Sequence, residues 1–80
     1  MVTLVVKVVK NDTGKPVKGV YVSVGCDEFF SLWTKPKTPT NAEGIAQFVI
    51  NGEAGFKGSI FADGKKVFEG KVMAFNTIYL

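Results

Sequence analysis

The stretch "VVKNDTGKPVKGVYVSV", residues 8–24, places two valine-rich runs on either side of a turn. Residues 19–25 alternate branched apolar side chains with other residues, which is the period-two spacing of a strand with one buried face. Between the runs, residues 11–14 supply turn chemistry, and Pro16 prevents a ladder from running straight through. The stretch therefore predicts a strand, a turn and a second strand.

The same stretch contains Gly14 followed by Lys15, a pair that also occurs in anion-binding loops. A phosphate loop needs glycine N–H groups that converge at the start of a helix. Here Pro16 follows the single glycine–lysine pair and has no N–H, and a strand comes next. We interpret the segment as a connector.

Period-two alternation continues outward from this stretch, and no run of ten residues has apolar positions at helical spacing without an interrupting glycine or proline. In residues 45–51 we expect Ala46, Phe48 and Ile50 to point inward and Gln47 outward. Pro36 and Pro39 impose extended chain with few ladder hydrogen bonds. Seven strands are predicted, at residues 2–9, 19–25, 29–34, 45–51, the two arms of a hairpin within 56–72, and 77–80.

The hairpin "FKGSIFADGKKVFEGKV", residues 56–72, allows two registers. A two-residue type I′ turn at Asp63-Gly64 leaves apolar residues on both faces, whereas a three-residue loop, 62–64, shifts the pairing by one residue. We favour the three-residue loop on this pattern. It predicts that Phe56, Ile60, Phe68 and Val72 share a face, that Phe68 covers Gly58, and that Lys57 faces Glu69.

These strands predict an all-β fold, a seven-stranded antiparallel β-sandwich formed by one domain over residues 1–80. Two sheets would bury their alternating faces against each other. The chain is 46% hydrophobic, which is enough apolar material for a small core.

The segments "VVKNDTGKPVKGVYVSV", "TNAEGIAQFVI", "FADGKKVFEGKV" and "IYL" together resemble the carboxypeptidase-regulatory-like and transthyretin-like group of domains. Gly19-Val20 departs from the glycine–alanine pair usual in that group. The resemblance implies an immunoglobulin-like sandwich that serves as an accessory or adhesive module, often extracellular or in the cell envelope, and in most cases without catalysis. It carries over no ligand-binding residues.

The inventory of reactive side chains is short. Histidine is absent and Cys26 is the single cysteine, which excludes common zinc and copper sites and histidine-based nucleophilic catalysis. Asp27-Glu28 offers too few oxygen ligands for calcium. We therefore expect no metal and no cofactor, a non-enzymatic protein, and a Cys26 that is a small buried apolar residue.

Charge and length limit the classes of partner. The net charge of +3 is dispersed and includes no arginine, so a nucleic-acid partner is disfavoured. The apolar residues 1–10 are too few to span a membrane and are interrupted by Lys7 and Lys10. They also lack the features of a signal peptide.

One loop is a candidate binding site. The aromatic residues Phe29, Phe30 and Trp33 lie beside Lys35 and Lys37, and exposed aromatics can stack on sugar rings. The alternative is that Trp33 packs over the edge of the sandwich.

The leading hypothesis is a module for protein–protein contact, assembly or attachment, with strand 2–9 as an edge that could pair between subunits. A carbohydrate-binding or other ligand-binding module that uses residues 29–37 is the second hypothesis.

Overall fold

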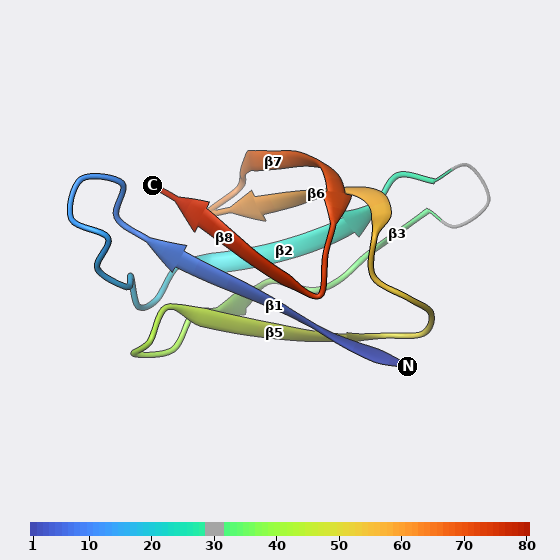
Figure 1. The fold of residues 1–80 in the computed structure, drawn as a ribbon, viewed down its shortest axis with the longest axis horizontal. Helices are drawn as coiled ribbons and strands as arrows, with labels where there is room; N and C mark the ends of the chain where they lie inside the picture. The colour runs from blue at the N-terminus through green and yellow to red at the C-terminus, as the bar shows by residue number, and fades with distance from the viewer. Residues whose placement is uncertain (29–31) are drawn as a thin grey trace.

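The computed structural model describes residues 1–28 and 32–80, and within them two β-sheets lie face to face (Figure 1). The all-β, two-sheet character predicted from the alternation is confirmed. The described strands number eight: β1 (Val2–Val9), β2 (Tyr21–Cys26), β3 (Trp33–Thr34), β4 (Thr38–Pro39), β5 (Ile45–Ile50), β6 (Phe56–Ala62), β7 (Lys65–Val72) and β8 (Phe75–Tyr79).

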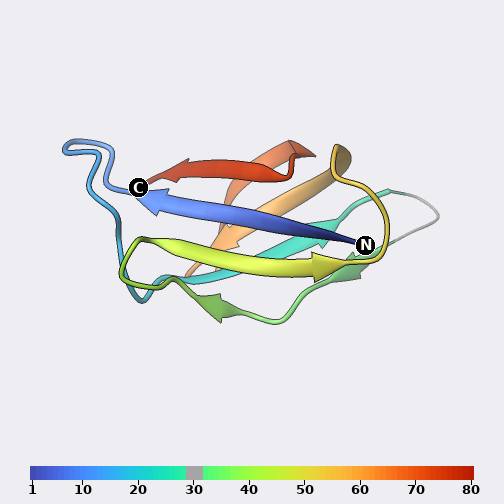
Figure 2. The same ribbon diagram turned by 60° about the horizontal axis from the view of Figure 1, so that its bottom comes forward.

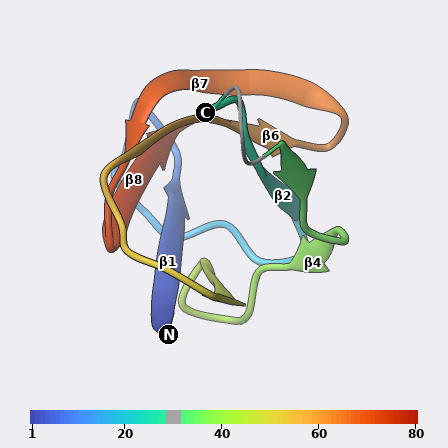
Figure 3. The same ribbon diagram turned by 90° about the vertical axis from the view of Figure 1, so that its right-hand side faces the viewer.

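The smaller sheet has the order β5-β1-β8, and the larger has the order β3-β2-β6-β7, with β4 also paired to β2. Figure 2 shows β5, β1 and β8 side by side in one layer. Viewed end on, β1 and β8 lie across the core from β2 and β6 (Figure 3). The connector 11–19 carries the chain from the small sheet to the large one, as expected for a turn segment.

One detail of the predicted sandwich is wrong. β1 pairs with β8 in parallel rather than antiparallel, because a short corner after β7 moves the chain into the other sheet in the direction of β1. Of the strand expected at 29–34, residues 33–34 form β3 and residues 29–31 lie outside the described part of the chain; β4 is an additional short strand. β3 and β4 both pair with the same side of β2. The Lys35 N–H still donates to the Val24 carbonyl, but Pro36 has no N–H, so the ladder stops there and the two strands are separate.

β1 is the central strand of the small sheet. Its side chains alternate as predicted, and Leu4, Val6 and Val8 are completely buried. It pairs with β5 on one side and with β8 on the other. The prediction that this strand is an edge available for pairing between subunits is therefore wrong, since both its sides are already hydrogen-bonded.

The core lies between the two sheets and consists of the inward positions of both. In β5 the prediction is confirmed, because Ala46, Phe48 and Ile50 are buried and Gln47 is exposed. At the C-terminal strand, Ile78 is buried, whereas Leu80 is 47% exposed because β8 ends before it. The remaining fully buried large side chains are Val22, Val24, Ile60 and Val72.

The β6–β7 hairpin has the turn that we did not favour. Ala62 pairs with Lys65 across a two-residue turn, in which Asp63 (φ 50°) and Gly64 (φ 84°) both have the positive φ of a type I′ turn. An irregularity between Ile60 and Phe61 then shifts the register. The remaining ladder pairs Phe56 with Val72, Lys57 with Lys71, Gly58 with Gly70, Ser59 with Glu69, and Ile60 with Phe68.

The shared face of the hairpin was nevertheless predicted correctly, because Phe56, Ile60, Phe68 and Val72 all contribute to the core or pack against it. The predicted contacts of Phe68 with Gly58 and of Lys57 with Glu69 are wrong. The ring of Phe68 lies beside Gly70, 3.5 Å from where a Cβ on that glycine would stand.

One buried hydroxyl joins the connector to the start of β2. Thr40 Oγ1 donates to the Val17 carbonyl at 2.6 Å and accepts the N–H of Val20 at 3.0 Å. Because a buried backbone group without a partner costs about 1–3 kcal/mol, this side chain stabilises a crossing that has few ladder bonds of its own.

Candidate functional site

Trp33 stands on β3, at the edge of the large sheet, and is partly buried. Its ring packs against Phe56, with 5.1 Å between the ring centroids and 59° between the planes. This is the alternative considered for Trp33, in which the indole covers the edge of the sandwich. Of the other aromatic candidates, Phe29 and Phe30 lie outside the described residues.

Two small hollows adjoin Trp33, with volumes of about 210 and about 170 Å³. Both are lined by Trp33, Ile50 and Asn51. Lys35 lines the larger hollow, whereas Lys37 lines neither of them. Each hollow is smaller than the usual range for drug-sized ligands, so the site has room for a small polar group or a single ring.

The smaller hollow brings in residues that sequence reasoning did not place at the site. Glu28 reaches it from the end of β2, and Glu53 from the turn between β5 and β6. The sequence marks residues 51–55 as a turn, but nothing in the local pattern shows that this turn faces Trp33. Cys26 also lines this hollow and is buried, as expected for a small apolar residue.

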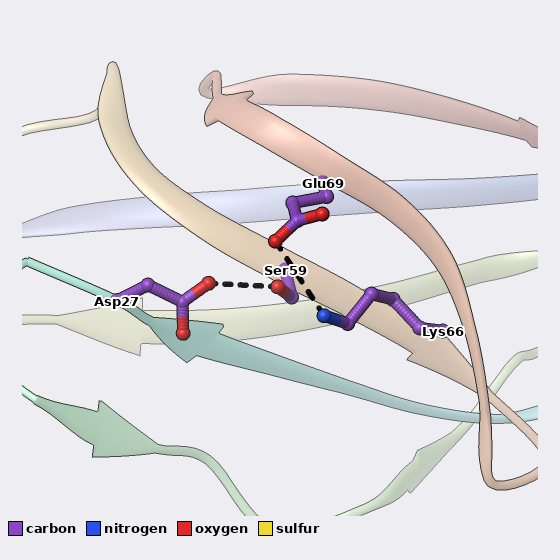
Figure 4. Close-up of polar contacts among 4 residues, drawn as sticks. All are labelled: Asp27, Ser59, Lys66 and Glu69. Carbon is purple, nitrogen blue, oxygen red and sulfur yellow. Dashed lines mark hydrogen bonds and ion pairs between the residues drawn. The ribbon is translucent and has the colours of Figure 1, made fainter.

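A second group of polar side chains lies on the outer face of the large sheet (Figure 4). Ser59 is 2% exposed, and its hydroxyl donates to Asp27 Oδ2 at 2.8 Å. On the neighbouring strand, Lys66 Nζ stands 3.5 Å from Glu69 Oε2, with both side chains largely in water.

These contacts are structural in character. A Ser–Lys dyad needs the lysine amine against the serine oxygen, but Lys66 is paired with Glu69 and the Ser59 hydroxyl is directed at a carboxylate. Glu28 accepts the N–H of Lys57 at 3.3 Å, and Asp27 donates its own N–H to the Lys57 carbonyl. The acidic pair Asp27-Glu28 is thus tied to β6 rather than arranged around an ion. Among residues 1–28 and 32–80, no three potential ligand side chains are grouped closely enough to hold a metal.

The outer edge of the small sheet has a different character. β8 carries no charged residue, and Phe75 and Tyr79 are 58% and 64% exposed. In the part of the chain that the structure describes, β1 is the one strand hydrogen-bonded to β8. The same part contains no helix with the length and apolarity needed to cross a membrane.

The edge of the large sheet at β7 offers a contrast. It carries the charged residues Lys65, Lys66, Glu69 and Lys71, and it contains the register irregularity opposite Ile60. Charges and irregularities of this kind are the usual protection of an edge strand against pairing with another chain. β8 has no such protection.

Comparison with known proteins adds no relative: no family model, no curated protein and no solved structure matches this chain. The likeness to carboxypeptidase-regulatory-like and transthyretin-like domains stays a prediction from the sequence.

Proposed function

We propose that this protein is a non-catalytic β-sandwich module that works by protein–protein contact, in assembly or attachment. The observation that carries the proposal is the β8 edge, an uncharged strand with two large exposed aromatic rings. Sheet edges of this kind bind other chains by strand addition, in which main-chain hydrogen bonds give affinity and alternate side chains give specificity. The immunoglobulin-like character and the extracellular or cell-envelope location belong to this proposal through the sequence resemblance.

The outer face of the small sheet supports the same role. Beside Phe75 in β8 lies the half-buried Val5 of β1, and beside Val5 lies Gln47 of β5. Val49 extends the exposed apolar positions along β5. Lys7 is the one charged residue of the three strands, so a partner chain could cover this face with little charge to desolvate.

The test combines self-association and capture of a partner by the purified protein. Sedimentation velocity is run over a concentration series, and the immobilised protein is offered extracts of its source cells. We expect a defined assembly or a specific partner whose retention is weakened by Tyr79→Lys and left unchanged by Lys65→Ala. A strict monomer that retains no partner would remove the proposal.

A small-ligand module is the second candidate, and the hollows around Trp33 are the observation that favours it. An indole beside Asn51, Glu28 and Glu53 combines an aromatic surface with amide and carboxylate groups, the chemistry that recognises a sugar ring. Because Trp33 is the single tryptophan, its fluorescence reports on this site alone.

Titration with neutral monosaccharides and oligosaccharides tests the second candidate directly. Binding would shift or quench the Trp33 emission in wild-type protein and weaken in Asn51→Ala, with Asn11→Ala as an exposed amide control remote from the hollows. An emission spectrum unchanged by every sugar at millimolar concentration would exclude this function.

A further inference from the structure

We infer that the partner of the β8 edge is a second copy of this chain, bound by antiparallel β8–β8 pairing about a twofold axis at Thr77. The two small sheets then form one continuous six-stranded sheet. This inference rests on the proposed function and specifies its partner.

The backbone of β8 is arranged for such pairing. Ala74 and Leu80 bond to β1, because the Ala74 carbonyl accepts the N–H of Val5 and the Leu80 N–H donates to Val9. In a parallel ladder alternate residues bond to a given neighbour, so the even-numbered residues of β8 face β1. Phe75, Thr77 and Tyr79 therefore direct their N–H and carbonyl groups away from β1.

The other outer strand of this sheet has a shorter open stretch. In β5 the residues that point away from β1 are Ile45, Gln47 and Val49. Ile45 is already occupied, since its N–H donates to Asn41 Oδ1 and its carbonyl accepts the Asn41 N–H, both at 3.0 Å. Two outward residues remain on β5, against three on β8.

The sequence of β8 is complementary to itself in the antiparallel direction. With Thr77 on the twofold axis, Phe75 of one copy lies opposite Tyr79 of the other, and this pair occurs twice. Cross-strand aromatic pairs contribute roughly 0.2–1 kcal/mol each beyond an alanine pair. On the inner face, Asn76 lies opposite Ile78 of the second copy. The Asn76 amide is already satisfied, because Nδ2 donates to the Met73 carbonyl at 2.8 Å and Oδ1 accepts the Met73 N–H at 3.0 Å.

The distribution of charge favours self-association through β8 rather than through the other edge strands. The chain carries a net charge of +3, so two copies associate only where the contact itself lacks like charges. Pairing through β7 would bring lysine-rich strands together, whereas β8 is neutral. Lys7, which lies beside Thr77, would stand three strand spacings from its counterpart, about 14 Å, beyond the Debye length of about 8 Å at physiological ionic strength.

The expected strength follows from the length of the contact. Five strand residues with two exposed aromatic rings give an interface at or below the small end of the range for stable complexes. We therefore expect a dissociation constant on the order of micromolar, so that monomer and dimer are both populated in ordinary measurements.

The first experiment compares four proteins by sedimentation velocity at concentrations from about 1 to about 500 μM, a range that brackets micromolar affinity. Thr77→Lys places like charges at the twofold axis and should raise the dissociation constant at least about tenfold. Gln47→Lys is the matched control on β5 and should leave it unchanged. Thr77→Pro removes an outward N–H that β1 does not use, and should also give a monomer.

The second experiment reads the pairing strand directly by residue-resolved amide hydrogen exchange in wild-type protein. The amides of Thr77 and Tyr79 should exchange more slowly as protein concentration rises, whereas those of Gln47 and Val49 should not change. Circular dichroism and unfolding midpoints of each variant show whether the monomer is still folded.

The outcomes separate this inference from the proposed function. A dimer that survives Thr77→Lys, or that protects β5 instead of β8, overturns the pairing while leaving assembly as the function. A monomer at every concentration that still captures another protein through Tyr79 overturns the second-copy partner alone. A monomer that captures nothing removes both.

Discussion

Gly58 shows how tightly two strands approach at a single residue. It pairs with Cys26 of β2 and with Gly70 of β7, and a Cβ placed on it would overlap the carbonyl oxygen of Gly25. The same Cβ would lie 2.9 Å from Cε2 of Phe56, the ring that packs on Trp33. The missing side chain therefore leaves room for the Phe56 ring, which packs against Trp33 at the edge of the sandwich.

We predict that Gly58→Ala lowers the free energy of unfolding by about 1–3 kcal/mol, because backbone or the Phe56 ring must shift to admit the methyl group. Gly25→Ala is the matched control one position away on the paired strand, where the new Cβ meets its nearest atoms at an ordinary 3.5 Å. That variant should be unchanged or stabilised by up to about 1 kcal/mol. Urea denaturation measures both, and equal losses in the two variants would contradict the steric argument.

At the scale of elements, the sequence predicts which face of a strand is buried more reliably than it predicts the partner of that strand. The inward residues of β1, β5 and β6 follow from alternation alone, since burial of apolar side chains decides their direction. The register of the β6–β7 hairpin does not follow from alternation. After the type I′ turn, the irregularity near Ile60 shifts the pairing and restores a shared apolar face. Counting apolar positions could not distinguish that combination from a three-residue loop.

Local sequence patterns also could not predict the pairing of β1 with β8. Val5 and Phe75 are distant in sequence, and nothing in either segment specifies a parallel neighbour. The site near Trp33 has the same limitation. Trp33 and Lys35 are two residues apart in the chain and were predicted as candidates, whereas Asn51 and Glu53 reach the hollows through tertiary packing.

The turn of the hairpin carries a prediction at the same scale. Asp63 has a left-handed backbone, its Oδ1 accepts the Tyr21 N–H at 3.0 Å, and its N–H donates to the Tyr21 carbonyl at 2.8 Å. Asp63→Ala loses the side-chain acceptor and disfavours the positive φ, so we expect a loss of about 1–2 kcal/mol in the free energy of unfolding. Asp63→Asn keeps both properties and should change it by less than about 0.5 kcal/mol. Thermal or urea unfolding checks the pair, and a tolerated alanine would show that the turn does not depend on this residue.

For the whole molecule, the layered arrangement keeps the two candidate sites apart. Trp33 and its hollows adjoin β3 at the edge of the large sheet, whereas the aromatic residues of β8 lie at the border of the small one. A variant at Asn51 and a variant at Thr77 therefore test different functions without sharing contacts. Ligand binding and assembly can be measured independently on one protein.

The parallel pairing of β1 and β8 has a mechanical consequence. The chain enters β1 at one end of the long axis and leaves β8 at the other (Figure 1). Tension applied between residues 1 and 80 would load all the hydrogen bonds of this ladder together, in shear. Tension between residues 1 and 74, both at the starts of the paired strands, would break them one after another. In single-molecule pulling we expect a markedly higher rupture force in the first geometry, and equal forces would show that another contact resists extension. Resistance of this kind would let the domain bear tension along its long axis without unfolding.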